Sequence, residues 1–155
     1  IADGIISPGE YAKTNDYGNY QIHWSSDEQF IYIAMSARTQ GWVAVGFKPF
    51  AGMLNADIVL GFVSDGETTI FDMFSPEYTG NHPPDTDQGG TYDILEFGGR
   101  EEATTTTIEF KRALNTGDQY DKKLTKGTNK IIWSYGSMDS PTQQHFDMGT
   151  GELEL

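Results

Sequence analysis

Apolar and polar residues alternate with a period of two along much of the chain, and helical periodicity is almost absent. In residues 30–37, Ile31, Ile33 and Met35 fall on one face and Tyr32 on the other. Similar short runs recur between clusters of Gly, Pro, Asn and Asp, which is typical of strands joined by turns. The predicted strands are 20–24, 30–37, 41–47, 56–63, 68–74, 92–99, 104–114, 129–136 and 145–155.

This spacing of about nine short strands predicts an all-β fold, an antiparallel β-sandwich. The three-residue connection 38–40 suggests that strands 30–37 and 41–47 form a hairpin. No internal repeat and no linker interrupts the pattern, so a single domain is expected over residues 1–155. The polar stretch 75–91 is a long predicted loop, and loops of this size are usually functional or mobile.

Composition narrows the possible functions. The formal net charge of −13 repels phosphate backbones, so a nucleic-acid partner is not expected. No run of eighteen apolar residues is present, so the chain is not expected to span a membrane. The chain begins at Ile1 rather than Met, which indicates either a removed leader or an excised domain.

Motifs for catalysis by the chain's own side chains are missing. The sequence contains no GxGxxG or P-loop pattern, no HExxH and no GxSxG, and its three histidines lie far apart. We therefore predict a binding or electron-transfer domain rather than an enzyme in its own right.

Two other binding sites are less favoured by the residues. The loop 85–96 resembles a calcium-binding loop at several positions, but Gly89 replaces an oxygen ligand and no flanking helices are predicted. A solvated loop is the simpler interpretation. Three tryptophans are candidates for a sugar-stacking platform, but each lies in a predicted strand among apolar residues, which favours the core. They are Trp24, Trp42 and Trp133.

Met53 stands in a predicted turn just before the apolar strand 56–63, an unusual place for a residue that normally fills cores. A thioether is a soft ligand, and haem iron is its most common partner in electron-transfer proteins. Such a site needs a second axial ligand, for which His145, in a polar loop before the last strand, is the best candidate. His82 and His23 are poorer ones. Taken alone, this pairing is a weak signal, and loop packing by Met53 is the alternative.

The combination "GWVAVGF…GMLNADIVLGFVSDG…IFDMFS", followed by "NKIIWSYGS…HFDMGTGELEL", resembles the DOMON domain family over nearly the whole chain. The resemblance implies an immunoglobulin-like β-sandwich that is extracellular, periplasmic or on the outer face of a membrane. Members of the family bind haem or sugars, or have lost any ligand. The haem-binding branch uses a methionine and a histidine at positions that correspond here to Met53 and His145.

The resemblance therefore implies non-covalent haem b with Met53 and His145 as iron ligands, in a pocket at one end of the sandwich. Adjacent apolar residues that would line such a pocket are Phe50, Leu54, Met138 and Phe146. The implied role is a cytochrome domain that relays single electrons between a redox enzyme or membrane cytochrome and an external acceptor. The alternative is a haem-free module that binds a carbohydrate or another small ligand.

Overall fold

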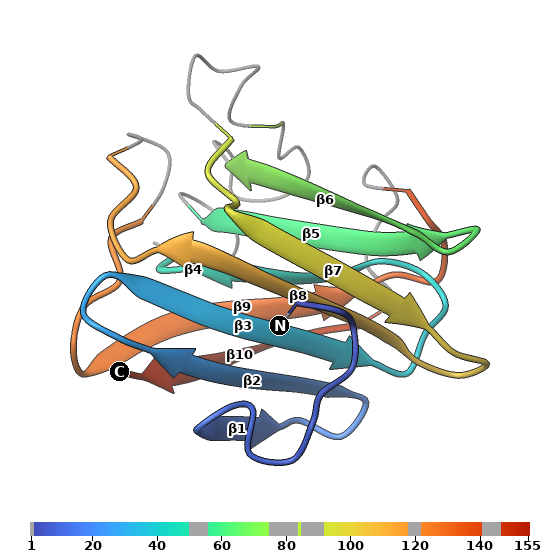
Figure 1. Cartoon of the computed structure of the whole chain (residues 1–155), viewed down its shortest axis with the longest axis horizontal. Coiled ribbons are helices and arrows are strands. Elements are labelled where there is room, and N and C mark those ends of the chain that lie inside the picture. The colour runs from blue at the N-terminus through green and yellow to red at the C-terminus, as the bar shows by residue number, and fades with distance from the viewer. Residues whose placement is uncertain (1, 50–55, 75–83, 85–91, 118–121, 141–146) are drawn as a thin grey trace.

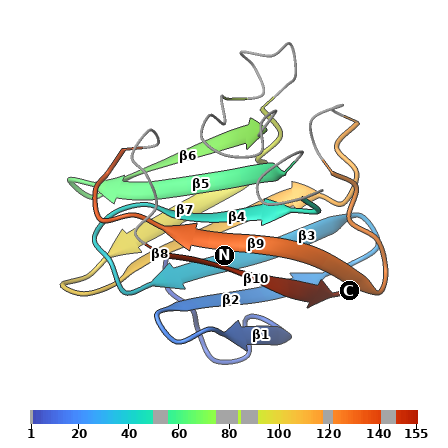
Figure 2. The same ribbon diagram turned by 180° about the vertical axis from the view of Figure 1, so that it is seen from behind.

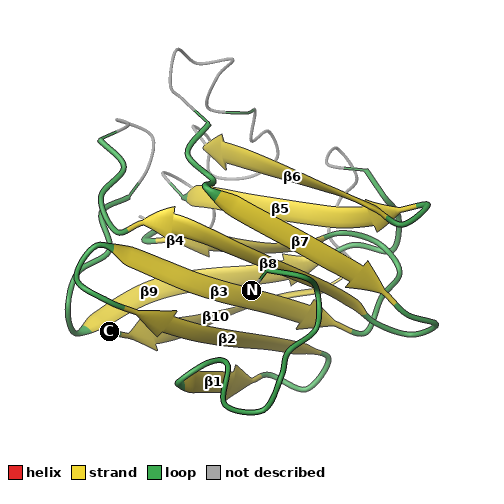
Figure 3. Cartoon of the chain, viewed as in Figure 1, coloured by secondary structure: helices red, strands yellow, loops and turns green. Residues whose placement is uncertain are grey.

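The computed structural model describes residues 2–49, 56–74, 84, 92–117, 122–140 and 147–155. These residues contain ten strands and no helix, and hence no helix long and apolar enough to cross a membrane (Figure 3). The strands are β1 (Lys13–Asp16), β2 (Tyr20–Ser26), β3 (Phe30–Ala37), β4 (Val43–Phe47), β5 (Asp57–Ser64), β6 (Glu67–Phe74), β7 (Glu96–Glu101), β8 (Thr106–Ala113), β9 (Thr128–Tyr135) and β10 (Asp147–Glu154).

The strands form two antiparallel sheets of five, which confirms the predicted β-sandwich (Figures 1 and 2). The first sheet has the order β1-β2-β3-β8-β7 and the second the order β10-β9-β4-β5-β6. Apolar residues at alternate positions of the central strands point between the sheets, as expected for two faces that exclude water from each other. This core includes Ile33 of β3, Val45 of β4, Val59 of β5 and Ile108 of β8, all with no exposed surface.

The predicted hairpin between residues 30–37 and 41–47 is wrong. β3 pairs with β2 and β8, whereas β4 pairs with β5 and β9 in the other sheet. The connecting residues bond to the second sheet: Thr39 Oγ1 donates to the Gly136 carbonyl (2.6 Å), and the Trp42 amide donates to the Met138 carbonyl (3.2 Å). These bonds carry the chain across the sandwich, so a short connection does not here imply adjacent strands.

All three tryptophans are buried. Trp24 and Trp133 lie in the core between the sheets, as predicted, whereas Trp42 is buried in a separate apolar cluster. Trp24 is 4% exposed, Trp42 3% and Trp133 8%. Trp133 stacks against Tyr20 and Tyr17, with ring centroids 4.9 and 5.3 Å apart.

Residues before β1 cover the outer face of the first sheet. There the fully buried carboxylate of Glu109 accepts hydrogen bonds from the amides of Asp3 (2.9 Å) and Gly4 (2.6 Å) and from the Tyr11 hydroxyl (2.7 Å). Close approach is possible because Gly98 lies beneath this segment, where a Cβ atom would stand 1.9 Å from the Ala2 carbonyl oxygen. The N-terminal segment is therefore packed onto the sandwich rather than extended from it.

Candidate functional site

The outer face of the second sheet carries an apolar cluster of its own, separate from the core between the sheets. Ala44, Ile58 and Leu60 point outward at positions that alternate with core residues, yet they are only 3%, 6% and 1% exposed. Trp42, Ala56 and Met73 complete this outer cluster, against which Phe62, Phe71 and Ile132 are partly buried. β4 and β5 are thus buried on both faces, and a large apolar surface is withdrawn from water outside the sandwich core.

Small residues on β4 leave its outer face without protruding side chains. Ala44 stands opposite Leu60, and Gly46 lies between Ile58 of β5 and Ile132 of β9 in the strand register. A Cβ atom on Gly46 would lie 2.7 Å from Ile132 Cγ1, so the neighbouring side chain closes over the glycine. The face therefore offers apolar contact over β4, β5 and β6.

Strand directions place the two proposed ligand loops at opposite ends of β4. Phe47 pairs with Asp57, so the connection 48–56 leaves at the Phe47 end. Val43 pairs with Tyr135, and Tyr135 pairs with Asp147, so the connection 136–146 leaves at the other end. The four intervals of β4 separate these ends by about 13 Å.

The expected pocket at one end of the sandwich stays a prediction, because residues 50–55 and 141–146 lie outside the described residues. A group bound from both connections would lie across the outer face of the second sheet, between them. Met53 and His145 themselves lie outside the described residues, as do three of the expected lining residues, Phe50, Leu54 and Phe146.

Met138, the remaining expected lining residue, is 60% exposed. Its backbone carbonyl accepts the hydrogen bond from the Trp42 amide at the base of the connection 136–146. Met138 therefore lies beside Trp42 of the outer cluster through its backbone, while its side chain is mostly exposed.

A buried ion pair that the sequence did not reveal fixes the start of β5. Arg112 Nη1 lies 2.5 Å from Asp57 Oδ2, and both side chains are almost fully buried. The Lys122 amide also donates to Asp57 Oδ2 (2.8 Å), while Arg112 Nη2 donates to the Lys122 carbonyl (2.7 Å). The Arg112 guanidinium lies over the Phe47 ring, 5.2 Å from its centroid. Both ends of the connection 48–56 are therefore held against one rigid cluster.

His23 is the one histidine within the described residues, and it lies on the first sheet. Its Nδ1 is 2.8 Å from Thr14 Oγ1, and its buried Nε2 has no hydrogen-bond partner. Burial lowers the pKa of His23, and the charge of Asp16 opposes this effect. Its position on β2 keeps it away from the outer face of the second sheet. His82 lies outside the described residues.

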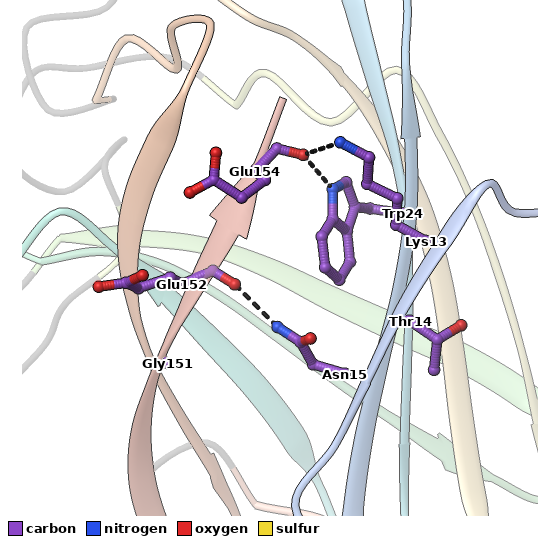
Figure 4. Close-up of a pocket in the computed structure, with 7 residues that line it drawn as sticks. All are labelled: Lys13, Thr14, Asn15, Trp24, Gly151, Glu152 and Glu154. Atoms are coloured by element: carbon purple, nitrogen blue, oxygen red, sulfur yellow. Dashed lines mark hydrogen bonds between the residues drawn. The ribbon is translucent and has the colours of Figure 1, made fainter.

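A groove runs between the edge strands β1 and β10 (Figure 4). Lys13 Nζ and Trp24 Nε1 both donate to the Glu154 carbonyl, at 2.7 and 3.0 Å, and Asn15 Nδ2 donates to the Glu152 carbonyl at 2.8 Å. These side chains cap carbonyls at the open edge of β10, and the Trp24 ring offers no exposed face. These hydrogen bonds join the edge strands and so close one side of the sandwich. Because the Trp24 ring is covered, the groove does not support a sugar-stacking platform.

The acidic loop 85–96 is described only in part. Asp93 donates its amide to Asp72 Oδ2 (2.9 Å), and Glu96 Oε1 is 4.0 Å from Lys111 Nζ. Within the described residues no group of three or more His, Cys, Asp or Glu side chains is placed to hold a metal ion. Residues 85–91 lie outside that range, so calcium binding by the complete loop is untested.

The fold is an antiparallel β-sandwich with an apolar cluster on the outer face of one sheet. Residues 16–136 match the DOMON domain family, and the chain belongs to this family.

The similar proteins are of two kinds, relatives in sequence and solved structures with the same fold. DBH-like monooxygenase protein 1 of Mus musculus is 33% identical over 142 residues, which cover 89% of this chain and 22% of the relative. MOXD1 homolog 1 of Drosophila melanogaster is 32% identical over 126 residues, covering 79% of this chain and 18% of the relative. The chain thus spans about a fifth of the length of these relatives.

The second group consists of solved cytochrome domains with the same fold. The cytochrome domain of Myriococcum thermophilum cellobiose dehydrogenase has a TM-score of 0.62 at 14% identity, over 88% of this chain and 74% of its own. The cytochrome b domain of pyranose dehydrogenase from Coprinopsis cinerea has a TM-score of 0.60 at 14% identity, over 86% and 74%.

Proposed function

We propose that this DOMON domain binds haem b non-covalently, with Met53 and His145 as the axial ligands of the iron, and that it relays single electrons. The observation that carries the proposal is the buried apolar outer face of β4 and β5, flanked by the two connections that contain these residues. A flat apolar macrocycle requires such a surface, and a thioether with an imidazole is a donor set suited to haem iron.

The chain is long enough for both ligands to reach one group over this face. Met53 precedes Ala56, a fully buried member of the outer cluster, by three residues, which span at most about 10 Å. His145 precedes Asp147 by two residues, or about 7 Å. Together with the two side chains, these lengths exceed the estimated separation of about 13 Å between the ends of β4.

Particular residues would hold and enclose the group. Leu60, Ala44 and Ile132 would supply apolar contact from the sheet, while Phe50, Leu54, Met138 and Phe146 would close over it from the two connections. No cysteine is present for covalent attachment, so retention would depend on axial bonds and apolar burial. With both axial positions taken by protein side chains, bound haem supplies one-electron transfer and no substrate site, and the thioether raises its reduction potential.

The relatives suggest the setting in which such a relay would act. Proteins named as monooxygenases and dehydrogenases contain or match this domain, so we propose that it serves a larger oxidoreductase and is not itself catalytic. The partner would then be a redox enzyme or a membrane cytochrome. An extracellular, periplasmic or outer-face location fits this proposal.

A second candidate function is a haem-free binding or interaction module of a monooxygenase. It is favoured by the sequence identity of 33% to the DBH-like monooxygenase protein, compared with 14% to the cytochrome domains. The low exposures of Ala44, Ile58 and Leu60 also favour this candidate, because the chain itself already covers the outer cluster.

Haem retention separates the two candidates. The purified protein is mixed with haemin and passed through a desalting column, and bound haem is measured against protein. The haem proposal predicts about one haem per chain and a Soret band that shifts on reduction. A protein that stays colourless supports the haem-free module, and retention on a polysaccharide column would then indicate a sugar ligand.

A further inference from the structure

Trp42 lies where the outer cluster meets the connection 136–146. It directly precedes β4, and its side chain is 3% exposed as a member of that cluster. Two backbone hydrogen bonds join it to the start of the connection. The Gly136 amide donates to the Trp42 carbonyl (2.9 Å), and the Trp42 amide donates to the Met138 carbonyl (3.2 Å). Because β4 and β9 run side by side, Trp42 stands at the end of β4 from which the chain continues towards His145 (Figure 2).

The indole N–H of Trp42 is a buried donor without an acceptor. Nε1 has almost no surface accessible to water, and among the described residues it has no hydrogen-bond partner. A buried N–H of this kind is unfavourable, because it loses its hydrogen bonds to water and gains none in return. Most buried polar side-chain atoms in folded proteins are paired, so this one calls for a specific explanation.

Gly136 keeps the space beside this N–H free of a side chain. A Cβ atom on Gly136 would lie 2.1 Å from Trp42 Nε1 and 2.4 Å from Cε2, so any other residue would press on this edge of the indole. Gly41 allows the same close approach from the preceding position, where a Cβ atom would lie 2.3 Å from the Gly136 carbonyl oxygen. The N–H edge of Trp42 is therefore bordered at this point by glycine backbone.

The other two tryptophans differ from Trp42. Trp24 Nε1 donates to the Glu154 carbonyl (3.0 Å). Trp133 Nε1 also lacks a partner among the described residues, but its ring lies in the core between the sheets, stacked on Tyr17 and Tyr20. Of the three tryptophans, all of which the structure describes, Trp42 alone combines an unpaired donor with a place on the outer cluster.

We propose that Trp42 Nε1 donates a hydrogen bond to a propionate carboxylate of haem b bound over the outer cluster. This inference rests on the proposed haem function. The propionates are the acceptors at the edge of this macrocycle, whose other substituents are methyl and vinyl groups. A hydrogen bond to a charged carboxylate is stronger than one between neutral groups. The formal net charge of −13 repels a carboxylate in general, so a local donor is needed to hold one.

The inference is tested by comparing haemin with haemin dimethyl ester, in which both carboxylates are blocked. Each compound is titrated into the complete chain, and binding is followed by absorption. Trp42→Phe keeps an aromatic ring but removes the donor. The matched control Trp133→Phe removes another unpaired indole N–H, away from the outer cluster. Gly136→Ala keeps the Trp42 donor but fills the space beside it. Thermal melting without haem establishes that the variants remain folded.

We expect Trp42→Phe to weaken haemin binding by at least about tenfold and ester binding by less than about threefold. Gly136→Ala should likewise weaken haemin binding more than ester binding, and Trp133→Phe should leave both within about twofold. Equal haemin affinities of Trp42→Phe and the wild type, or equal losses for haemin and its ester, would overturn this inference and leave the proposed haem function standing. A wild-type protein that binds neither compound would overturn both.

Discussion

Arg112 of β8 and Asp57 of β5 join the two sheets through a buried ion pair, with Arg112 Nη1 2.5 Å from Asp57 Oδ2. The pair closes the interior at the end of the sandwich where the connection 48–56 begins and ends. Its exposed fractions, 1% for Arg112 and 0% for Asp57, mean that neither charge has access to water if the other is removed. The first prediction follows from this mutual dependence.

Replacing Arg112 alone is expected to be costly because it leaves the Asp57 carboxylate buried and uncompensated. Arg112→Met should lower the free energy of unfolding by about 3–5 kcal/mol. The double variant Arg112→Met/Asp57→Asn should recover part of that loss, since the amide oxygen still accepts from the Lys122 amide. Urea denaturation of the single and double variants measures the coupling. Strictly additive losses would show that the two side chains do not stabilise each other.

Gly149 of β10 lies against the Trp133 ring, so a larger residue there should disturb the core. A Cβ atom at this position would lie 2.3 Å from Trp133 Cζ2, and the ring is already stacked on Tyr17 and Tyr20. Gly149→Ala should destabilise the fold by about 1–3 kcal/mol and shift the tryptophan fluorescence. The neighbouring exposed substitution Thr150→Ala should change stability by less than about 0.5 kcal/mol. Equal effects of the two substitutions would contradict the packing described for Trp133.

His23 should make stability depend on pH. Because burial lowers its pKa in the folded state, the unfolded chain takes up the proton first as the pH falls. The stability contributed by neutral His23 is complete above its unfolded pKa of about 6.5 and declines as the pH falls through the lower folded value. The substitution His23→Gln removes this titration and should flatten the curve.

Urea midpoints of the wild type and His23→Gln between about pH 7.5 and pH 5 measure the difference. Above the interval in which carboxylates titrate, the two curves should diverge as the pH is lowered. Parallel curves throughout would mean that His23 is protonated equally easily in both states.

Alternation of apolar and polar residues was enough to predict the sandwich, since it specifies one buried face for each strand. It did not predict β1, whose sequence Lys-Thr-Asn-Asp has no apolar face and whose position depends on pairing with β2. It also suggested a wrong hairpin between β3 and β4, because a short connection does not reveal whether the chain stays in one sheet.

The outer cluster is visible in the sequence as an unbroken apolar run, which a search for alternating apolar and polar residues does not detect. Residues 57–63 are apolar at nearly every position after Asp57, and such an unbroken run is typical of a strand buried on both faces. The ion pair between Asp57 and Arg112 left a weaker signal in the sequence. An aspartate at the start of an apolar run indicates that it has a partner, but here the partner is 55 positions away. No local pattern identifies Arg112 as that partner.

We propose above that Met53 and His145 hold one haem from opposite ends of β4. The most direct test of this proposal is the absorption spectrum of the haem-loaded protein, oxidised and reduced, for the wild type and the variants Met53→Leu and His145→Ala, with Met148→Leu and His23→Ala as controls. We expect Met53→Leu to keep the haem but to change its spectrum and lower its potential. We expect His145→Ala to retain little haem and both controls to match the wild type. Wild-type spectra in both ligand variants, or no haem in the wild-type protein, would contradict the proposal.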